Sequence, residues 1–194
     1  MSTLYTNNIR AATGTQVSMA NGHTLYAPGH VLQVQYVSSG SRVSTSNTYP
    51  NWAEPSTDYR VSITPTQSNS MIQLQYYVPL NQNSAANILT TIRAFRIING
   101  GSKSYGLTSS GSPQGSRNVV AGGVFRPNNG YDGNDMNMVS FTAIDFPATT
   151  SPCVYGFETM PEGTALVRFG YSGGDNAAWG WDADIVITAT EVGQ

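Results

Sequence analysis

The stretch Ile72-Gln73-Leu74-Gln75-Tyr76-Tyr77-Val78 decides the fold class, because its side chains change character with a period of two. Successive side chains of a β-strand point to opposite faces of the sheet. The pattern therefore predicts a half-buried antiparallel strand, with Ile72, Leu74, Tyr76 and Val78 in a core and both glutamines in solvent.

The same alternation recurs along the chain and predicts further strands. It is found at residues 32–36, 59–63, 139–143, 167–171 and 185–190. In each case the apolar set is expected to face the core, for example Leu32, Val34 and Tyr36 in the first. Residues 85–98 also fit helical spacing, but their β-branched composition favours a strand.

Turn-forming residues separate these segments. Asn99-Gly100-Gly101, Asn129-Gly130 and Asp132-Gly133 supply positive φ at low cost, and prolines such as Pro161 are expected between strands. Many short strands without alternating helices predict an all-β fold, an antiparallel β-sandwich of jelly-roll type. We place this head domain at residues 29–194.

Residues 1–28 are expected to behave differently from the head. Their apolar residues are too thinly spread to bury a core alone. We therefore predict an extended N-terminal segment that is ordered by a partner or by copies of itself. The attachment and oligomerisation candidates in it are Leu4, Tyr5, Ile9, Val17, Met19 and Leu25.

The surface chemistry of the chain is unusual. Only 10% of its 194 residues are charged, against about 25% in an ordinary soluble domain. Its 21 Ser, 20 Thr, 16 Asn and 9 Gln make a third of the chain polar but uncharged. With a net charge of −2 and one lysine, Lys103, the chain is not expected to bind nucleic acid.

Other classes are also disfavoured. No apolar run reaches the roughly 20 residues of a membrane span, so membrane insertion is not expected. We recognise no secretory signal in the first residues. One cysteine, Cys153, excludes an intrachain disulfide and a cysteine-cluster zinc site, and it is expected to be a buried, inert thiol.

Catalytic chemistry has few candidates. Both histidines, His23 and His30, lie in or beside the N-terminal segment, so no catalytic triad is predicted. The spacing of the carboxylates pairs no two of them for glycosidase chemistry. The loop after Asp132 has calcium-type spacing with Asn134, but position 12 of an EF-hand would be Ala143. We therefore predict no catalytic residue, metal or cofactor; an enzyme remains a third hypothesis.

Aromatic residues suggest where the protein could contact a host surface. Trp179 and Trp181 are two residues apart, so they would share one face of an extended segment, beside polar side chains that can bond a sugar. The alternative is that they close the end of the sandwich. Together with Tyr131, Asp132 and Asn134, they are the candidate receptor or glycan contacts.

The order of the strand segments resembles a virion-surface module of tailed phages, of the marine and cyanobacterial type. The matching stretches are residues 29–34, 61–65 and 70–74, then 139–150 and 185–191. Met1-Ser2-Thr3-Leu4-Tyr5 with Asn8-Ile9 also looks like the N-termini of such proteins. Residues 100–135 match least well, which leaves a receptor pocket undefined.

The resemblance implies a non-enzymatic tail fibre, spike or adhesin, usually homotrimeric, on the virion surface after assembly in the host cytoplasm. The N-terminal segment would attach it to other virion proteins, and the head would bind a host glycan or protein. A capsid decoration (cement) protein is one alternative. A free carbohydrate-binding module, favoured by Trp179 and Trp181, is another.

Overall fold

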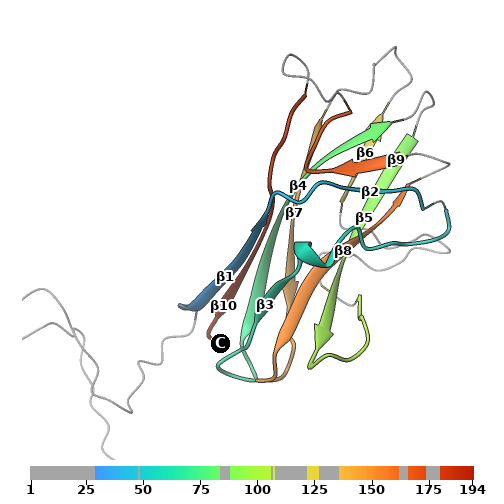
Figure 1. The fold of residues 1–194 in the computed structure, drawn as a ribbon. Coiled ribbons are helices and arrows are strands. Elements are labelled where there is room, and N and C mark those ends of the chain that lie inside the picture. Colours follow the sequence, from blue (N-terminus) through green and yellow to red (C-terminus); the bar gives the residue numbers. More distant parts are fainter. Residues whose placement is uncertain are drawn as a thin grey trace, which may run out of the picture.

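The computed structural model describes most of the head domain predicted from the sequence. The described residues are 29–47, 49–83, 88–105, 107, 122–126, 136–161, 166–173 and 180–194. Within them nearly all regular structure is antiparallel strand, arranged as two sheets (Figure 1). The predicted all-β sandwich is confirmed.

The first sheet is ordered β1-β10-β4-β9-β2, with β7 on the other edge of β4. Its strands are β1 (Val31–Ser39), β2 (Val43–Thr45), β4 (Met71–Asn83), β7 (Asn137–Asp145), β9 (Leu166–Phe169) and β10 (Ile185–Val192). The second sheet is ordered β3-β8-β5-β6. Its strands are β3 (Val61–Ile63), β5 (Ile88–Ile98), β6 (Gly122–Arg126) and β8 (Cys153–Pro161), and a 3₁₀ turn, η1 (Thr57–Tyr59), precedes β3.

Strand β4 is the centre of the first sheet. Its first half pairs with β10 on one edge, its last residues pair with β9 on the same edge, and β7 runs along the other edge. Ile72, Leu74, Tyr76 and Val78 are all at least 99% buried, as the alternation predicted. The glutamines between them face outward.

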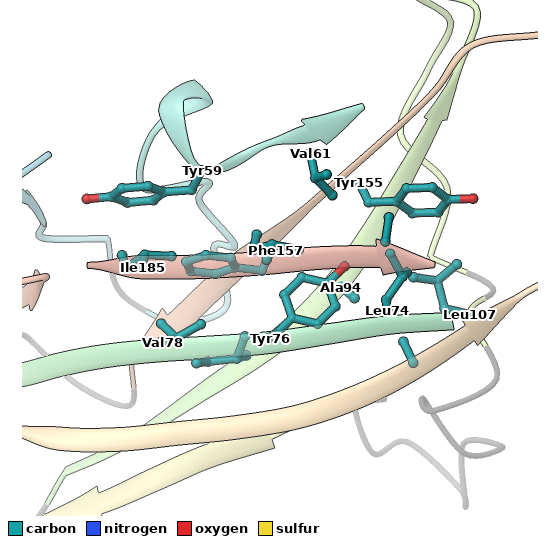
Figure 2. Packing of buried hydrophobic residues seen from close by; sticks show 14 of the residues in the cluster. Tyr59, Val61, Leu74, Tyr76, Val78, Ala94, Leu107, Tyr155, Phe157 and Ile185 are labelled. Carbon is teal, nitrogen blue, oxygen red and sulfur yellow. The ribbon is translucent and has the colours of Figure 1, made fainter. Parts of the chain in front are cut away.

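The core lies between the two sheets and is built from the alternate residues of both. Tyr76 of β4 stacks on Phe141 of β7 with ring centroids 4.4 Å apart, and Tyr59 stacks on Phe157 at 6.0 Å. Figure 2 shows Tyr59 and Phe157 in the upper part of this cluster and Tyr76 beside β4. Such stacked pairs contribute about 0.5–1.5 kcal/mol beyond their buried area.

One charged clamp joins the sheets inside this apolar interior. Arg96 of β5 donates to both carboxylate oxygens of Asp145 of β7, at 2.6 and 2.8 Å. The hydroxyl of Tyr155 on β8 donates to the same carboxylate at 2.8 Å. Asp145 is 4% exposed, so these donors replace the water that its charge would otherwise require.

A second buried carboxylate holds β1 against the sandwich. Glu191 of β10 is fully buried and accepts hydrogen bonds from the hydroxyls of Ser70 and Thr66 and from the Gln33 amide, at 2.6, 2.9 and 2.7 Å. Burial by itself would raise the pKa of Glu191, but these bonds favour the ionised form and hold the pKa below its ordinary value.

Strand β1 forms as predicted, but the predicted face is wrong. Val34 and Tyr36 are 52% and 72% exposed, and Leu32 is only half-buried. The register pairs Gln33, Gln35 and Val37 with the core-facing residues of β10, so these side chains are on the inner side of the sheet; Gln33 and Val37 are half-buried there, and Gln35 remains exposed at the edge.

The pairing is irregular where β1 begins, which the sequence pattern does not reveal. Gly29, at φ +85°, donates to the Gly193 carbonyl, while the Gly193 N–H donates to His30. A further register shift lies between Val31 and Gln33. A shift of one residue in the pairing exchanges the inward and outward faces of a strand. The apolar residues of β1 alone therefore predicted the wrong inward face.

Several other expectations are corrected or confirmed. Tyr59 belongs to the 3₁₀ turn rather than to a strand over 59–63, and Tyr171 lies beyond β9 in an isolated bridge to Asp182. Pro161 is the last residue of β8, not a residue between strands. Residues 88–98 are strand, as predicted, and the turn after them has positive φ at Asn99 and Gly100.

We expect the packing of Phe95 on Gly156 to be sensitive to a single methyl group. A Cβ added at Gly156 would lie 2.6 Å from the Cζ of Phe95, whose ring is fully buried. Gly156→Ala should lower the free energy of unfolding by about 1–3 kcal/mol, measured by urea denaturation. Gly193→Ala is the control, since its nearest new contact would be 3.4 Å away; equal effects of both variants would contradict this account.

The buried Glu191 predicts a loss of stability in acid. Its pKa in the folded protein lies below its ordinary value of 4.5, so its contribution is complete above that pH and is lost as pH falls through the lowered pKa. Glu191→Gln should therefore lower stability at pH 7 and flatten the decline between about pH 5 and pH 3. Urea midpoints across this range measure both effects, and an unchanged slope in the variant would refute the assignment.

Candidate functional site

The outward residues of four adjacent strands are all uncharged, and the carboxylate of Asp184, which accepts from Ser38 at 2.6 Å, lies at their border just before β10. The strands β1, β10, β4 and β7 lie side by side, and their registers align their outward residues in rows. Together these residues form the surface called here the neutral face: Val34, Tyr36, Ser38, Gln73, Gln75, Tyr77, Met138, Ser140, Thr142, Ile144, Val186, Thr188 and Thr190.

The neutral face exposes large apolar side chains at its two margins. On β1, Tyr36 is 72% exposed, and Val34 lies beside it on the same face. On β7, at the opposite margin, Met138 and Ile144 are 48% and 38% exposed. An exposed apolar patch of this kind, surrounded by uncharged polar groups, is typical of a surface that contacts another molecule.

The centre of the neutral face is hollowed. The hollow has a volume of about 310 Å³ and lies over β4, β7 and β10. Six of its eight lining residues belong to the neutral face: Gln75, Tyr77, Ser140, Thr142, Val186 and Thr188. Its hydroxyl and amide groups can donate and accept hydrogen bonds, and its tyrosine and valine supply apolar surface.

A connected group of charged residues lies on the other sheet. Glu158 of β8 accepts from Arg93 at 2.6 Å and from Lys103 at 2.9 Å, and Lys103 also reaches Glu54 at 2.7 Å. Glu54 in turn binds Arg60 at 2.6 Å. We call these five residues the charged cluster.

Aromatic rings complete the charged cluster. The Arg93 guanidinium lies 4.3 Å from the ring centroid of Trp52 and 3.8 Å from that of Tyr105. The Lys103 ammonium lies 4.4 Å from the ring of Phe95. Burial alone would raise the pKa of Glu54 and Glu158, but the cations beside them hold both pKa values below the ordinary range. Each carboxylate of the cluster has two basic partners, so the cluster stabilises the fold; its three cations and two carboxylates leave a net charge of +1.

Trp181 is the one predicted receptor contact within the described residues, and it is exposed. Its indole is 62% exposed, and its backbone N–H donates to the Ser172 hydroxyl at 2.9 Å while its carbonyl accepts from the Ser172 N–H. Asp182 beside it pairs with Arg42. This removes Trp181 from the core and leaves its ring available on the surface.

The remaining predicted contacts lie outside the described residues. These are Tyr131, Asp132, Asn134 and Trp179, together with the N-terminal candidates Leu4, Tyr5, Ile9, Val17, Met19 and Leu25. The sequence predicts neutral solvent faces on single strands, but it does not predict that four of them join into the neutral face. Its signal was present in the glutamines and threonines of the strands, but only the register shows that they share one surface.

Among the described residues, no group of three or more His, Cys, Asp or Glu side chains is placed to hold a metal ion. No helix in the described part is long and apolar enough to cross a membrane. Cys153 is buried, as predicted, and burial raises the pKa of its thiol.

Comparison with known proteins shows similarity at the level of solved structures. No family model and no curated protein matches the sequence. The chain is similar to a structure of infectious bursal disease virus, Gt strain, with a TM-score of 0.40 and 10% identity over 92% of this chain and 42% of that one. A mutant VP2 protein of the same virus, in derived T=1 particles, gives 0.40 and 10% over 91% and 40%. The chain thus spans about two-fifths of the length of these structures.

Proposed function

We propose that the chain is a non-enzymatic structural protein of a virus particle, which works by binding other proteins through its β-sandwich head. The observation that carries the proposal is the neutral face. Four strands present thirteen uncharged outward residues, with Tyr36 and Met138 exposed at opposite margins. Packing such a face against another protein removes no charge from water, so little desolvation opposes the contact.

The distribution of charge supports the same role. Glu54, Glu158 and Asp145 each have a basic partner within 3 Å, and these pairs lie away from the neutral face. Contacts through a face without charge depend little on ionic strength. A virion protein that must stay assembled in media of varying salt benefits from that independence.

Within this role we propose a short tail fibre or spike, displayed on the virion surface. Residues 1–28 would attach the chain to other virion proteins and help to hold three copies together, and the head would contact the host. The order of the strand segments, which resembles phage surface modules, motivates this finer assignment. A capsid decoration protein is the alternative, and it would use the neutral face to brace neighbouring heads on the shell.

Location on the particle tests the proposal directly. An antibody against the purified chain, visualised by electron microscopy on particles from the source culture, should label a tail or spike. Labelling spread over the capsid lattice would favour the decoration role. Absence of the chain from purified particles would refute the virion assignment altogether.

Removing residues 1–28 should separate attachment from folding. The described strands begin at Val31, so the shortened chain should keep the cooperative unfolding of the head. It should fail to bind particles that lack the native protein, measured by co-sedimentation. Full binding by the shortened chain would contradict the role given to the segment.

Trp181 gives a specific reason to test a glycan as the host receptor. An exposed indole beside polar groups suits stacking on a sugar ring. If the head binds a host glycan, Trp181→Ala should weaken binding on a glycan array at least about tenfold, the loss typical of a central contact. Tyr49→Phe is the control, because Tyr49 is similarly exposed at a different site and keeps its ring.

A further inference from the structure

We propose that the partner of the neutral face is a second copy of this chain, with Tyr36 of one copy seated in the hollow of the next. This inference rests on the proposed assembly role and names the partner and the contact. It requires three properties of the neutral face: a projecting side chain, a hollow that accepts it, and a chemistry that allows the face to meet itself.

Tyr36 is the projecting side chain. At 72% it is the most exposed of the large hydrophobic residues described, and it stands on an edge strand (Figure 1). Strand side chains project roughly perpendicular to the sheet, so the ring points away from its own head. Tyrosine is favoured in protein interfaces because its ring buries a large area while its hydroxyl keeps a hydrogen bond.

The hollow matches such a ring in chemistry and size. Its volume of about 310 Å³ lies at the small end of the range of pockets for small ligands, about 300–1,000 Å³, which suits one inserted side chain. Tyr77 and Val186 offer apolar contact, and Gln75, Ser140 and Thr142 offer partners for a phenol hydroxyl. Tyr36 does not line the hollow of its own head.

The position of Tyr36 relative to the hollow fits contact between copies. The registers place Tyr36 in one row with Thr188, Gln75 and Thr142. Three strand spacings, about 14 Å, therefore separate Tyr36 from Thr142 within a head. A projection and a hollow side by side on one face are complementary in two copies related by a twofold axis, so this contact joins heads in pairs and is separate from the trimer proposed through residues 1–28.

The absence of charge favours a second copy over an unrelated partner. In a symmetric contact, residues near the rotation axis lie close to the same residues of the other copy. Equal charges at those positions would repel each other. None of the thirteen residues of the neutral face is charged; the carboxylate at its border, Asp184, accepts from Ser38 at 2.6 Å and lies at one end of the face, so most of the face can meet itself without that penalty. An unrelated charged partner would find no complementary charge there.

The area of the neutral face limits how strongly two copies can associate through it. Four strands about 4.8 Å apart and about 20 Å long present roughly 400 Å² of flat area. A stable complex usually buries about 800 Å² on each partner. We therefore expect the contact to be weak by itself and to need residues 1–28 for a lasting assembly.

The first experiment measures self-association of the full-length chain by sedimentation velocity over a concentration series. We expect oligomers of the 20.7 kDa chain, and we expect Tyr36→Ala to weaken association at least about tenfold. Thr142→Trp, which fills the hollow, should have the same effect. Trp181→Ala is the control, because it removes an aromatic ring of similar exposure away from the neutral face.

The second experiment maps the contact by cross-linking. Chains carrying Tyr36→Cys and chains carrying Thr142→Cys are mixed and treated with a short thiol-to-thiol reagent; native Cys153 is fully buried and should not react. We expect cross-links between the two chains in the mixture, at higher yield than with either chain alone. Each chain carries only one of the two new cysteines, so a cross-link between these two positions can only join two chains.

The outcomes separate this inference from the proposed function. A chain that stays monomeric at high concentration, or oligomers that resist both variants and give no mixed cross-link, would overturn the Tyr36 contact. Stoichiometry of two would keep the contact and contradict the proposed trimer. Absence from virus particles would refute the virion role and leave the contact standing.

Discussion

The double pairing of β4 is the constraint on which the rest of the structure depends. One edge of this strand is occupied first by β10 and then by β9, and the other by β7. The strict alternation of its side chains therefore divides the molecule. Ile72, Leu74 and Tyr76 define the core side, and the same pairing aligns the outward residues of its neighbours into the neutral face. The core and the candidate contact surface are thus the two faces of the same sheet.

The charged side chains are also distributed unevenly between the neutral face and the rest of the head. Most acidic and basic side chains on the described strands form ion pairs with one another, in the Arg96–Asp145 clamp and in the charged cluster. Glu191 ties the edge strand β1 to the β3–β4 connection through Gln33, Thr66 and Ser70. Charges that stabilise the fold in this way leave the neutral face uncharged. They make stability sensitive to acid, while contacts through that face depend little on salt.

The neutral face also raises the question of aggregation. An exposed, uncharged edge strand such as β1 invites pairing with other chains, and proteins usually protect such edges with lysine, proline or a bulge. In β1 the only protection of these kinds is the irregular pairing at its start, before Gln33. A regular partner that covers this edge would remove that risk, and the proposed assembly role would supply one.

Alternation by itself determined the all-β class and the strands around residues 72–78, 139–143 and 185–190, because a two-residue period reports directly on a half-buried strand. It did not reveal β8, whose nine residues are almost all buried and therefore show no alternation. It also placed Val34 and Tyr36 in the core, since apolar character does not tell which face a strand turns inward. Only the tertiary structure decided that, through the irregular pairing of β1 with β10, and only the register of four strands distant in sequence gathered their outward residues into one uncharged surface.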